Sequence, residues 1–219
     1  MGARTGPGPD GRGTVLPPSP RVWLGLTAAL GALGVLLLAL RYGGEGEPGA
    51  VDARIGSVVD GVGTPWRYAA LALDALGEPV GAVLLVSALV TGCLLLRRPR
   101  AAVFLLAAVG LTVGTATLLK HLVGRTIHGD GNLSYPSGHT AFLTAIALVV
   151  AMVAVRRRRG GRPLVLGSAL LAGGLMGWAE VALGAHYPTD TLGGWCTALA
   201  VTPATGWLVD RTSGRQGAH

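Results

Sequence analysis

The sequence predicts an all-α integral membrane protein, a polytopic bundle of six transmembrane helices with one further helix at the external membrane interface. Half of the 219 residues are hydrophobic, only 13% are charged, and the mean hydropathy is +0.53. This composition is too apolar for an ordinary soluble domain. The apolar residues also form blocks of about 20, the length at which a helix crosses roughly 30 Å of hydrocarbon. We therefore expect one membrane domain over residues 21–210.

The chain begins with two segments of different character. Residues 1–20 are rich in glycine and proline and have no apolar periodicity, which predicts a disordered cytoplasmic tail. The apolar block 22–40 is longer than the core of a signal peptide, so we interpret it as the first membrane helix. Between 42 and 66, acidic residues and glycines alternate with apolar residues at helical spacing. This pattern predicts an external loop that carries a short interfacial helix.

Five further apolar blocks predict the other membrane helices. They lie at 68–96, 101–119, 139–155, 163–185 and 189–209. Clusters of arginine follow the second and the fourth of the six helices. Six crossings place both termini on the same side of the membrane, and the polar residues 211–219 are expected to form a short cytoplasmic tail.

The distribution of basic residues predicts the orientation. With both termini in the cytoplasm, thirteen arginines lie inside, against four arginines and one lysine outside. The positive-inside rule favours this arrangement, so the polar loops at 120–138 and near 186 face the outside. The net charge of +7 therefore reflects topology, and we expect no nucleic acid partner. Cys93 and Cys196 fall inside apolar blocks and indicate no disulfide framework.

The stretch 135–139, read YPSGH, lies directly before an apolar helix. Ser137 is suited to cap that helix and Gly138 allows close approach of a ligand to the backbone. Helix N-termini bind anions through their free N–H groups, and His139 in the same turn is a candidate proton donor. Taken alone, the stretch also fits a capped helix with an interfacial histidine.

His186 and Asp190 are one helical turn apart. The carboxylate can bind one ring nitrogen and leave the other basic, which makes the imidazole a candidate nucleophile or base. The alternative is a polar pair at a helix entrance. Because ionisable groups near a bilayer are costly and usually functional, two such stretches on one face favour a functional site.

Basic residues open the loop after the third helix. Lys120 can neutralise a phosphate as a point charge and Arg125 through a bidentate fork, although both can also extend to the interface without a ligand. His121, His128 and Asp130 fit loop residues better than catalysts, with His128 kept as a possible substrate or modulating residue.

On these residues the chain resembles the type-2 phosphatidic acid phosphatase superfamily of membrane lipid phosphatases. That family has a lysine followed by an Arg-Pro pair, then PSGH, then Ser-Arg leading to HxxxD. Lys120 matches the lysine of the first motif, residues 136–139 match the second without change, and His186 with Asp190 match the end of the third. The resemblance covers about residues 20–210 and implies a six-helix protein, expected in a bacterial cell membrane with its site outside.

The resemblance also implies the roles of the matched residues. His186 would attack phosphorus to give a phosphohistidine, Asp190 would orient it, and His139 would protonate the leaving alkoxide. Lys120, together with the region of Ser137 and Gly138, would hold the phosphoryl oxygens. The family's chemistry needs no metal and no cofactor, and the expected partners are a lipid phosphate and the bilayer.

Two departures from the family's pattern stand out. Ile127 and His128 occupy the positions of the Arg-Pro pair, and Ala179 and Glu180 occupy those of Ser-Arg. Arg125 lies two residues from the first position and is a candidate replacement. Glu180 brings a negative charge into the fifth helix, where a buried carboxylate must be paired or protonated. We expect Glu180 to pair with Lys120 or Arg125, or to contact a polar group of the substrate.

The function that these observations favour is hydrolysis of a lipid-linked phosphate or diphosphate, such as phosphatidic acid, phosphatidylglycerophosphate or a polyprenyl phosphate. A phosphotransferase with the same intermediate is an alternative, and so is a protein that binds lipid phosphate without turnover. A transporter or structural protein would leave both motifs unexplained. A metal site at His139, His186 and Asp190 is conceivable from ligand type alone.

Overall fold

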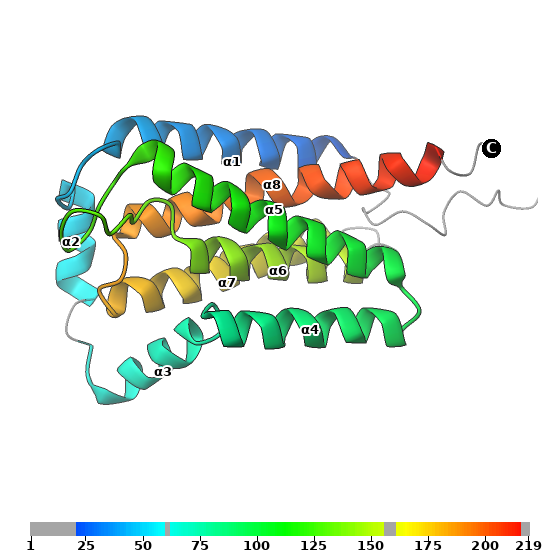
Figure 1. The fold of residues 1–219 in the computed structure, drawn as a ribbon, viewed down its shortest axis with the longest axis horizontal. Helices are drawn as coiled ribbons and strands as arrows, with labels where there is room; N and C mark the ends of the chain where they lie inside the picture. Colours follow the sequence, from blue (N-terminus) through cyan, green and yellow to red (C-terminus); the bar gives the residue numbers. More distant parts are fainter. Residues whose placement is uncertain (1–20, 60–61, 156–160, 216–219) are drawn as a thin grey trace, which may run out of the picture.

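The computed structural model describes residues 21–59, 62–155 and 161–215, and these residues form helices joined by loops (Figure 1). Within that part of the chain the helices are α1 (Arg21–Tyr42), α2 (Ala50–Val59), α3 (Thr64–Asp74), α4 (Pro79–Leu95), α5 (Pro99–Val123), α6 (Gly138–Val155), α7 (Arg162–Ala182) and α8 (Pro188–Arg215). The predicted all-α class is confirmed. The tail predicted over 1–20 lies outside the described residues.

The long helices run alongside one another, and α2 lies across one end of the bundle (Figure 1). α8 packs against α1, α5, α6 and α7. α1 begins and α8 ends at the end opposite α2. The loops 124–137 and 183–187 both lie at the α2 end, so the two polar stretches of the sequence meet there.

Four helices of the described chain, α1, α5, α6 and α7, are long and apolar enough to cross a membrane. A fifth crossing results if the bent pair α3 and α4 is one span. The sixth predicted helix corresponds to α8, whose threonine, glycine and proline residues make it less apolar. By length and composition the structure therefore supports four or five crossings, and the count of six stays a prediction.

The single helix predicted over 68–96 is wrong, because the segment consists of α3 and α4, bent by 62° at residues 75–78. Pro79 is the first residue of α4 and lacks the N–H that would continue a helix from α3. Glu78 before it is extended, with φ −62° and ψ 152°. Asp74, at the end of α3, and Glu78 therefore lie on either side of the bend.

The ends of two other helices differ from the predicted ones. α5 continues to Val123 and stops at Gly124, whose φ of 65° is the left-handed conformation typical of a helix C-cap. α8 continues to Arg215 instead of ending near 209, so the first part of the segment predicted as a tail is helical. Arg211 lies over the ring of Trp207 at 3.4 Å and stabilises this extension.

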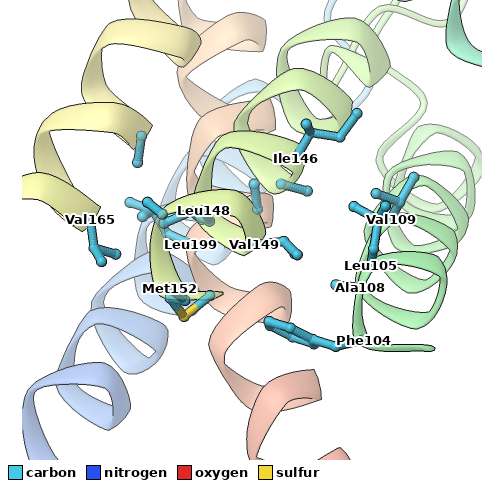
Figure 2. Close-up of a cluster of buried hydrophobic side chains, with 14 of the residues drawn as sticks. Phe104, Leu105, Ala108, Val109, Ile146, Leu148, Val149, Met152, Val165 and Leu199 are labelled. Carbon is cyan, nitrogen blue, oxygen red and sulfur yellow. The ribbon is translucent and has the colours of Figure 1, made fainter. Parts of the chain in front are cut away.

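The hydrophobic core is built around α6, between α5, α7 and α8 (Figure 2). Figure 2 shows Ile146, Val149 and Met152 of α6 beside Leu105 of α5 and Leu199 of α8. Leucines on the outer faces of α1 and α4 are exposed instead. Since lipid tails are as apolar as leucine, such outer faces suit helices in a bilayer. The central position of α6 fixes the place of its N-terminus, which carries the PSGH stretch.

Candidate active site

Ser137 caps α6, as predicted. Its Oγ accepts a hydrogen bond from the backbone N–H of Thr140 at 3.2 Å, and Ser137 is fully buried. Gly138 is the first helical residue and His139 the second. The cap therefore orients the first turn of α6, including the imidazole of His139, toward the loop end of the bundle.

The two polar stretches of the sequence are joined directly. The backbone N–H of Ser137 donates to the carbonyl oxygen of Asp190 at 3.0 Å. α8 approaches this turn closely because Gly194 has no side chain, and a Cβ there would overlap the carbonyl of Ser137. The start of α6 and the start of α8 thus form one rigid unit that carries His139 and Asp190.

His186 lies beside Asp190, with Nδ1 3.8 Å from Oδ2. This separation is a contact rather than a hydrogen bond, and Oδ2 accepts the backbone N–H of Tyr187 at 3.1 Å. The His186 side chain is only 9% exposed, and this burial lowers its pKa below the usual value for histidine. The imidazole is therefore neutral at neutral pH, the form that a nucleophile or base requires.

Arg125 is fully buried and forms an ion pair with Asp190. Its Nη1 donates to Oδ1 of Asp190 at 2.6 Å, and its Nη2 donates to Oδ2 of Asp52 at 2.7 Å. The guanidinium also stacks between the rings of Tyr42 and Tyr187, at 4.3 and 4.5 Å from their centroids. Both terminal nitrogens of Arg125 therefore bind carboxylates, and the contact with phosphate that the sequence suggested stays a prediction.

Asp52, which the sequence did not point to, is buried beside the candidate site. It lies in α2, is 2% exposed, and accepts hydrogen bonds from the backbone N–H and the Oγ1 of Thr189 at 2.9 and 3.0 Å. It is the one acidic residue within α2. Because Arg125 is 73 residues away in the chain, no local spacing relates the two. The buried carboxylate of Asp52 therefore joins α2, at the place of the predicted interfacial helix, to the start of α8.

A cavity of about 700 Å³ opens beside the histidines. Lys120, Gly138, His139 and His186 line its polar part. Its other walls are mostly apolar residues of α4, α5 and α6, namely Ala82, Val83, Val86, Val109, Val113 and Phe142. The ammonium of Lys120 donates to the carbonyl oxygen of Leu133 at 2.8 Å. Four of the predicted site residues thus share one cavity.

Glu180 lies between the two imidazoles. Its Oε1 is 3.7 Å from Nδ1 of His139 and its Oε2 is 3.6 Å from Nε2 of His186. The carboxylates of Asp74 and Glu78 approach Nε2 of His139 at 3.7 and 3.8 Å. The neighbours of the Glu180 carboxyl group are thus the imidazoles of His139 and His186, in place of the expected ion pair with Lys120 or Arg125. Asp74 and Glu78 fall inside the helix predicted over 68–96, and the Gly-Glu-Pro sequence at 77–79 was the available signal for a bend.

His128 lies apart from this cluster. Its Nε2 is 2.7 Å from the carbonyl oxygen of Gly184, which links the loop 124–137 to the α7–α8 connection. Ile127 beside it is buried, with 4% of its surface exposed. The position where the family carries an arginine is therefore an apolar packing position in this chain.

These elements define a class of protein, a helical membrane protein with a PSGH turn and a His–Asp pair at one end of the bundle. The family profile of the PAP2 superfamily matches residues 101–213, more than half of the chain. The chain belongs to the PAP2 superfamily.

The chain is also similar to two individual proteins. Over 83 residues the chain is 36% identical to undecaprenyl-diphosphatase BcrC of Bacillus subtilis (strain 168), a match that covers 38% of this chain and 39% of that protein. The chain thus matches less than half the length of this relative. It also superposes on the crystal structure of the first transmembrane PAP2 type phosphatidylglycerolphosphate phosphatase from Bacillus subtilis, with a TM-score of 0.66 and 21% identity. That superposition covers 86% of this chain and 96% of the other, and shows a shared fold. The apolar helices and this fold identify an integral membrane protein.

Proposed function

We propose that this protein hydrolyses a lipid-linked phosphate or diphosphate. The observation that carries the proposal is the divided cavity, with Lys120, His139 and His186 at one part and apolar side chains of α4 and α5 along the rest. A lipid phosphate has the same division into a charged head and an apolar chain. The names of both relatives describe hydrolases of lipid phosphates, which supports this substrate class.

The proposed reaction uses His186 as the nucleophile. Its Nδ1 faces Asp190, so Nε2 attacks phosphorus while the bond to the leaving oxygen breaks, and His139 gives that oxygen a proton. Water then attacks the phosphohistidine and releases inorganic phosphate and free His186. Asp190, held by Arg125, stabilises the imidazolium as it forms. The chemistry of bond breaking needs no cofactor.

The phosphoryl oxygens are proposed to bind between Lys120 and the N-terminus of α6. Lys120 lines the cavity together with Gly138, whose N–H group begins the helix. Ser137 supports this anion site indirectly, since its hydroxyl caps the helix. A helix N-terminus and a lysine together supply the positive field that phosphoryl transfer requires.

The proposed orientation places this end of the bundle outside the cell, with α8 as a further crossing and α2 at the external interface. Both polar loops lie at the α2 end, and α1 begins and α8 ends at the other end (Figure 1). The thirteen arginines assigned to the cytoplasmic side support this direction.

The test is phosphate release by the purified full chain from a panel of lipid phosphates and diphosphates. We expect release by the native chain, loss of release in His186→Ala, and no effect of His121→Ala, which removes an exposed histidine of α5. Acid-labile phosphate bound covalently to the native chain after incubation with substrate, and absent from His186→Ala, would support the phosphohistidine. Equal release by the native chain and His186→Ala contradicts the mechanism.

A second candidate is a protein that binds lipid phosphate without turnover. The carboxyl group of Glu180 beside His186, and the buried Ile127 where the family has an arginine, favour it. Binding of the lipid panel with no release of phosphate would decide for this candidate. Transfer of phosphate to an added alcohol would instead identify a phosphotransferase with the same intermediate.

A further inference from the structure

We propose that Glu180 is a further catalytic residue, which supplies a proton to His139 in the first step and takes a proton from water in the second. This role rests on the proposed hydrolysis. In that reaction His139 loses a proton to the leaving oxygen, and the water that attacks the phosphohistidine releases one. A single group in contact with both imidazoles can connect the two events.

The carboxyl group of Glu180 is placed to exchange protons with both histidines. Oε1 faces Nδ1 of His139 at 3.7 Å, and Oε2 faces Nε2 of His186 at 3.6 Å. These separations are contacts, and a shift of about half an ångström would bring either pair within hydrogen-bond distance. Nε2 of His186 is also the proposed attacking atom, since Nδ1 faces Asp190. Oε2 therefore lies next to the nitrogen that carries the phosphoryl group in the intermediate.

Glu180 is buried without a cationic side chain bound to it. Its side chain is 1% exposed, and its Oε1 has no hydrogen-bond partner in the described part of the chain. The guanidinium of Arg125 is bound by two other carboxylates, and the ammonium of Lys120 donates to a backbone carbonyl. A buried carboxyl group must be paired or protonated. Before substrate binds, Glu180 therefore holds a proton beside Nδ1 of His139.

In the first step this proton passes through His139. Nε2 of His186 forms a bond to phosphorus while the bond from phosphorus to the leaving oxygen breaks, and that oxygen keeps the electron pair. His139 gives the oxygen its Nε2 proton, and its Nδ1 takes the proton of Glu180. The leaving group departs protonated, His139 stays neutral, and Glu180 becomes a carboxylate.

In the second step the carboxylate of Glu180 accepts a proton from water as the water oxygen bonds to phosphorus. The bond between phosphorus and Nε2 of His186 breaks, and its electron pair returns to the nitrogen. Inorganic phosphate departs and His186 is neutral again. Glu180 then holds a proton, as it did before substrate was bound, so the next turnover can begin.

The two neighbouring carboxylates are not placed for this role. Asp74 and Glu78 face the opposite ring nitrogen of His139, at 3.7 and 3.8 Å from Nε2. Within the described ranges the ion-pair contacts of His186 are with Glu180 and Asp190. Glu180 also stands where the family's pattern has an arginine, a residue that keeps its proton. This chain therefore carries a group that can exchange a proton at a position of permanent charge.

The test uses 4-nitrophenyl phosphate and the purified full chain in detergent. Its leaving group is a weak base and needs no proton from His139, so the phosphohistidine forms without the first step of the relay. In Glu180→Gln we expect a rapid release of about one nitrophenolate per chain. Hydrolysis of the phosphohistidine should then be about 10²-fold slower than in the native chain, and acid-labile phosphate should accumulate on His186. Glu47→Gln, which changes an exposed loop carboxylate, should show neither effect.

An unchanged rate of phosphohistidine hydrolysis in Glu180→Gln overturns the proposal. Slower turnover without accumulated phosphohistidine also overturns it, because a merely structural defect would slow formation as well. If Glu180→Gln does not fold, Glu180→Asp replaces it, since the shorter side chain withdraws the carboxyl group from both imidazoles. An unchanged rate of hydrolysis in that variant would again reject the role.

The native chain separates this proposal from the proposed function. If it turns over lipid phosphates alone, rapid quenching with the best lipid of the panel measures the same rate of phosphohistidine hydrolysis. A native chain that releases phosphate from none of these substrates rejects hydrolysis, and the role of Glu180 with it. A native chain that releases phosphate leaves hydrolysis standing, whatever the Glu180 variants show.

Discussion

Arg125 donates from Nη1 to Oδ1 of Asp190 across 2.6 Å, and both side chains are fully buried. The contact joins the loop after α5 to the first turn of α8, and the second terminal nitrogen extends it to Asp52 of α2. The carboxylate that faces His186 is therefore held by an arginine 65 residues away in the chain.

Arg125→Ala should destabilise the protein strongly. The change leaves two buried carboxylates unpaired, and breaking a buried ion pair costs about 3 to 5 kcal/mol. Arg125→Lys should lower the free energy of unfolding by less, because lysine keeps the positive charge and loses only the bidentate geometry of the guanidinium. Unfolding by denaturant in detergent measures both. Arg41→Ala, which breaks the exposed pair with Glu45, is the control and should cost about 1 kcal/mol or less. Equal effects in Arg125→Ala and Arg41→Ala would contradict this account.

Gly194→Ala should destabilise the junction between α6 and α8. The new methyl group would overlap the carbonyl of Ser137, and overpacking of this kind costs about 1 to 3 kcal/mol. Gly114→Ala is the matched control, because no atom outside its own helix lies within 4 Å of its Cβ position. In an open helical position the same change should stabilise by about 0.5 to 1 kcal/mol. The same sign for both variants in thermal unfolding would count against the packing argument.

Lys120→Met should lower phosphate release while leaving the fold intact. The substitution keeps an unbranched side chain at the cavity and removes the charge proposed to hold phosphoryl oxygens. Loss of one such group costs about 10²-fold in rate. The assay is kcat for the best substrate of the panel, with the exposed Arg54→Met of α2 as control. An unchanged kcat in Lys120→Met would remove Lys120 from the site.

Glu180→Arg should strengthen the inhibition of the protein by inorganic phosphate. It replaces a carboxylate 3.6 Å from His186 by a guanidinium, which binds phosphate through a bidentate fork. We expect an inhibition constant for phosphate at least tenfold lower. If phosphate affinity and activity both stay at the native level, Glu180 does not belong to the substrate site.

Much of the fold follows from local sequence properties. Apolar blocks with polar ends predicted the helices α1, α5, α6, α7 and α8, because burial in lipid or in a core depends on composition and length. The prediction failed between Asp74 and Pro79, where the segment predicted as one helix bends by 62°. A proline can either start a helix or kink one, and only the packing of Gly77 on His139 decides between the two.

The sequence by itself determined that this is a helical membrane protein and that Ser137, His139, His186 and Asp190 belong to motifs of one family. These features are local, since a helix cap, a histidine in the next turn and a carboxylate one turn from an imidazole are set by spacing along the chain. The tertiary structure alone decided the partners of the charges. It buried Arg125 between Asp52 and Asp190, and it gathered Asp74 and Glu180 around His139. Electrostatic partners are chosen by distance in space, and the folding of separate helices sets that distance.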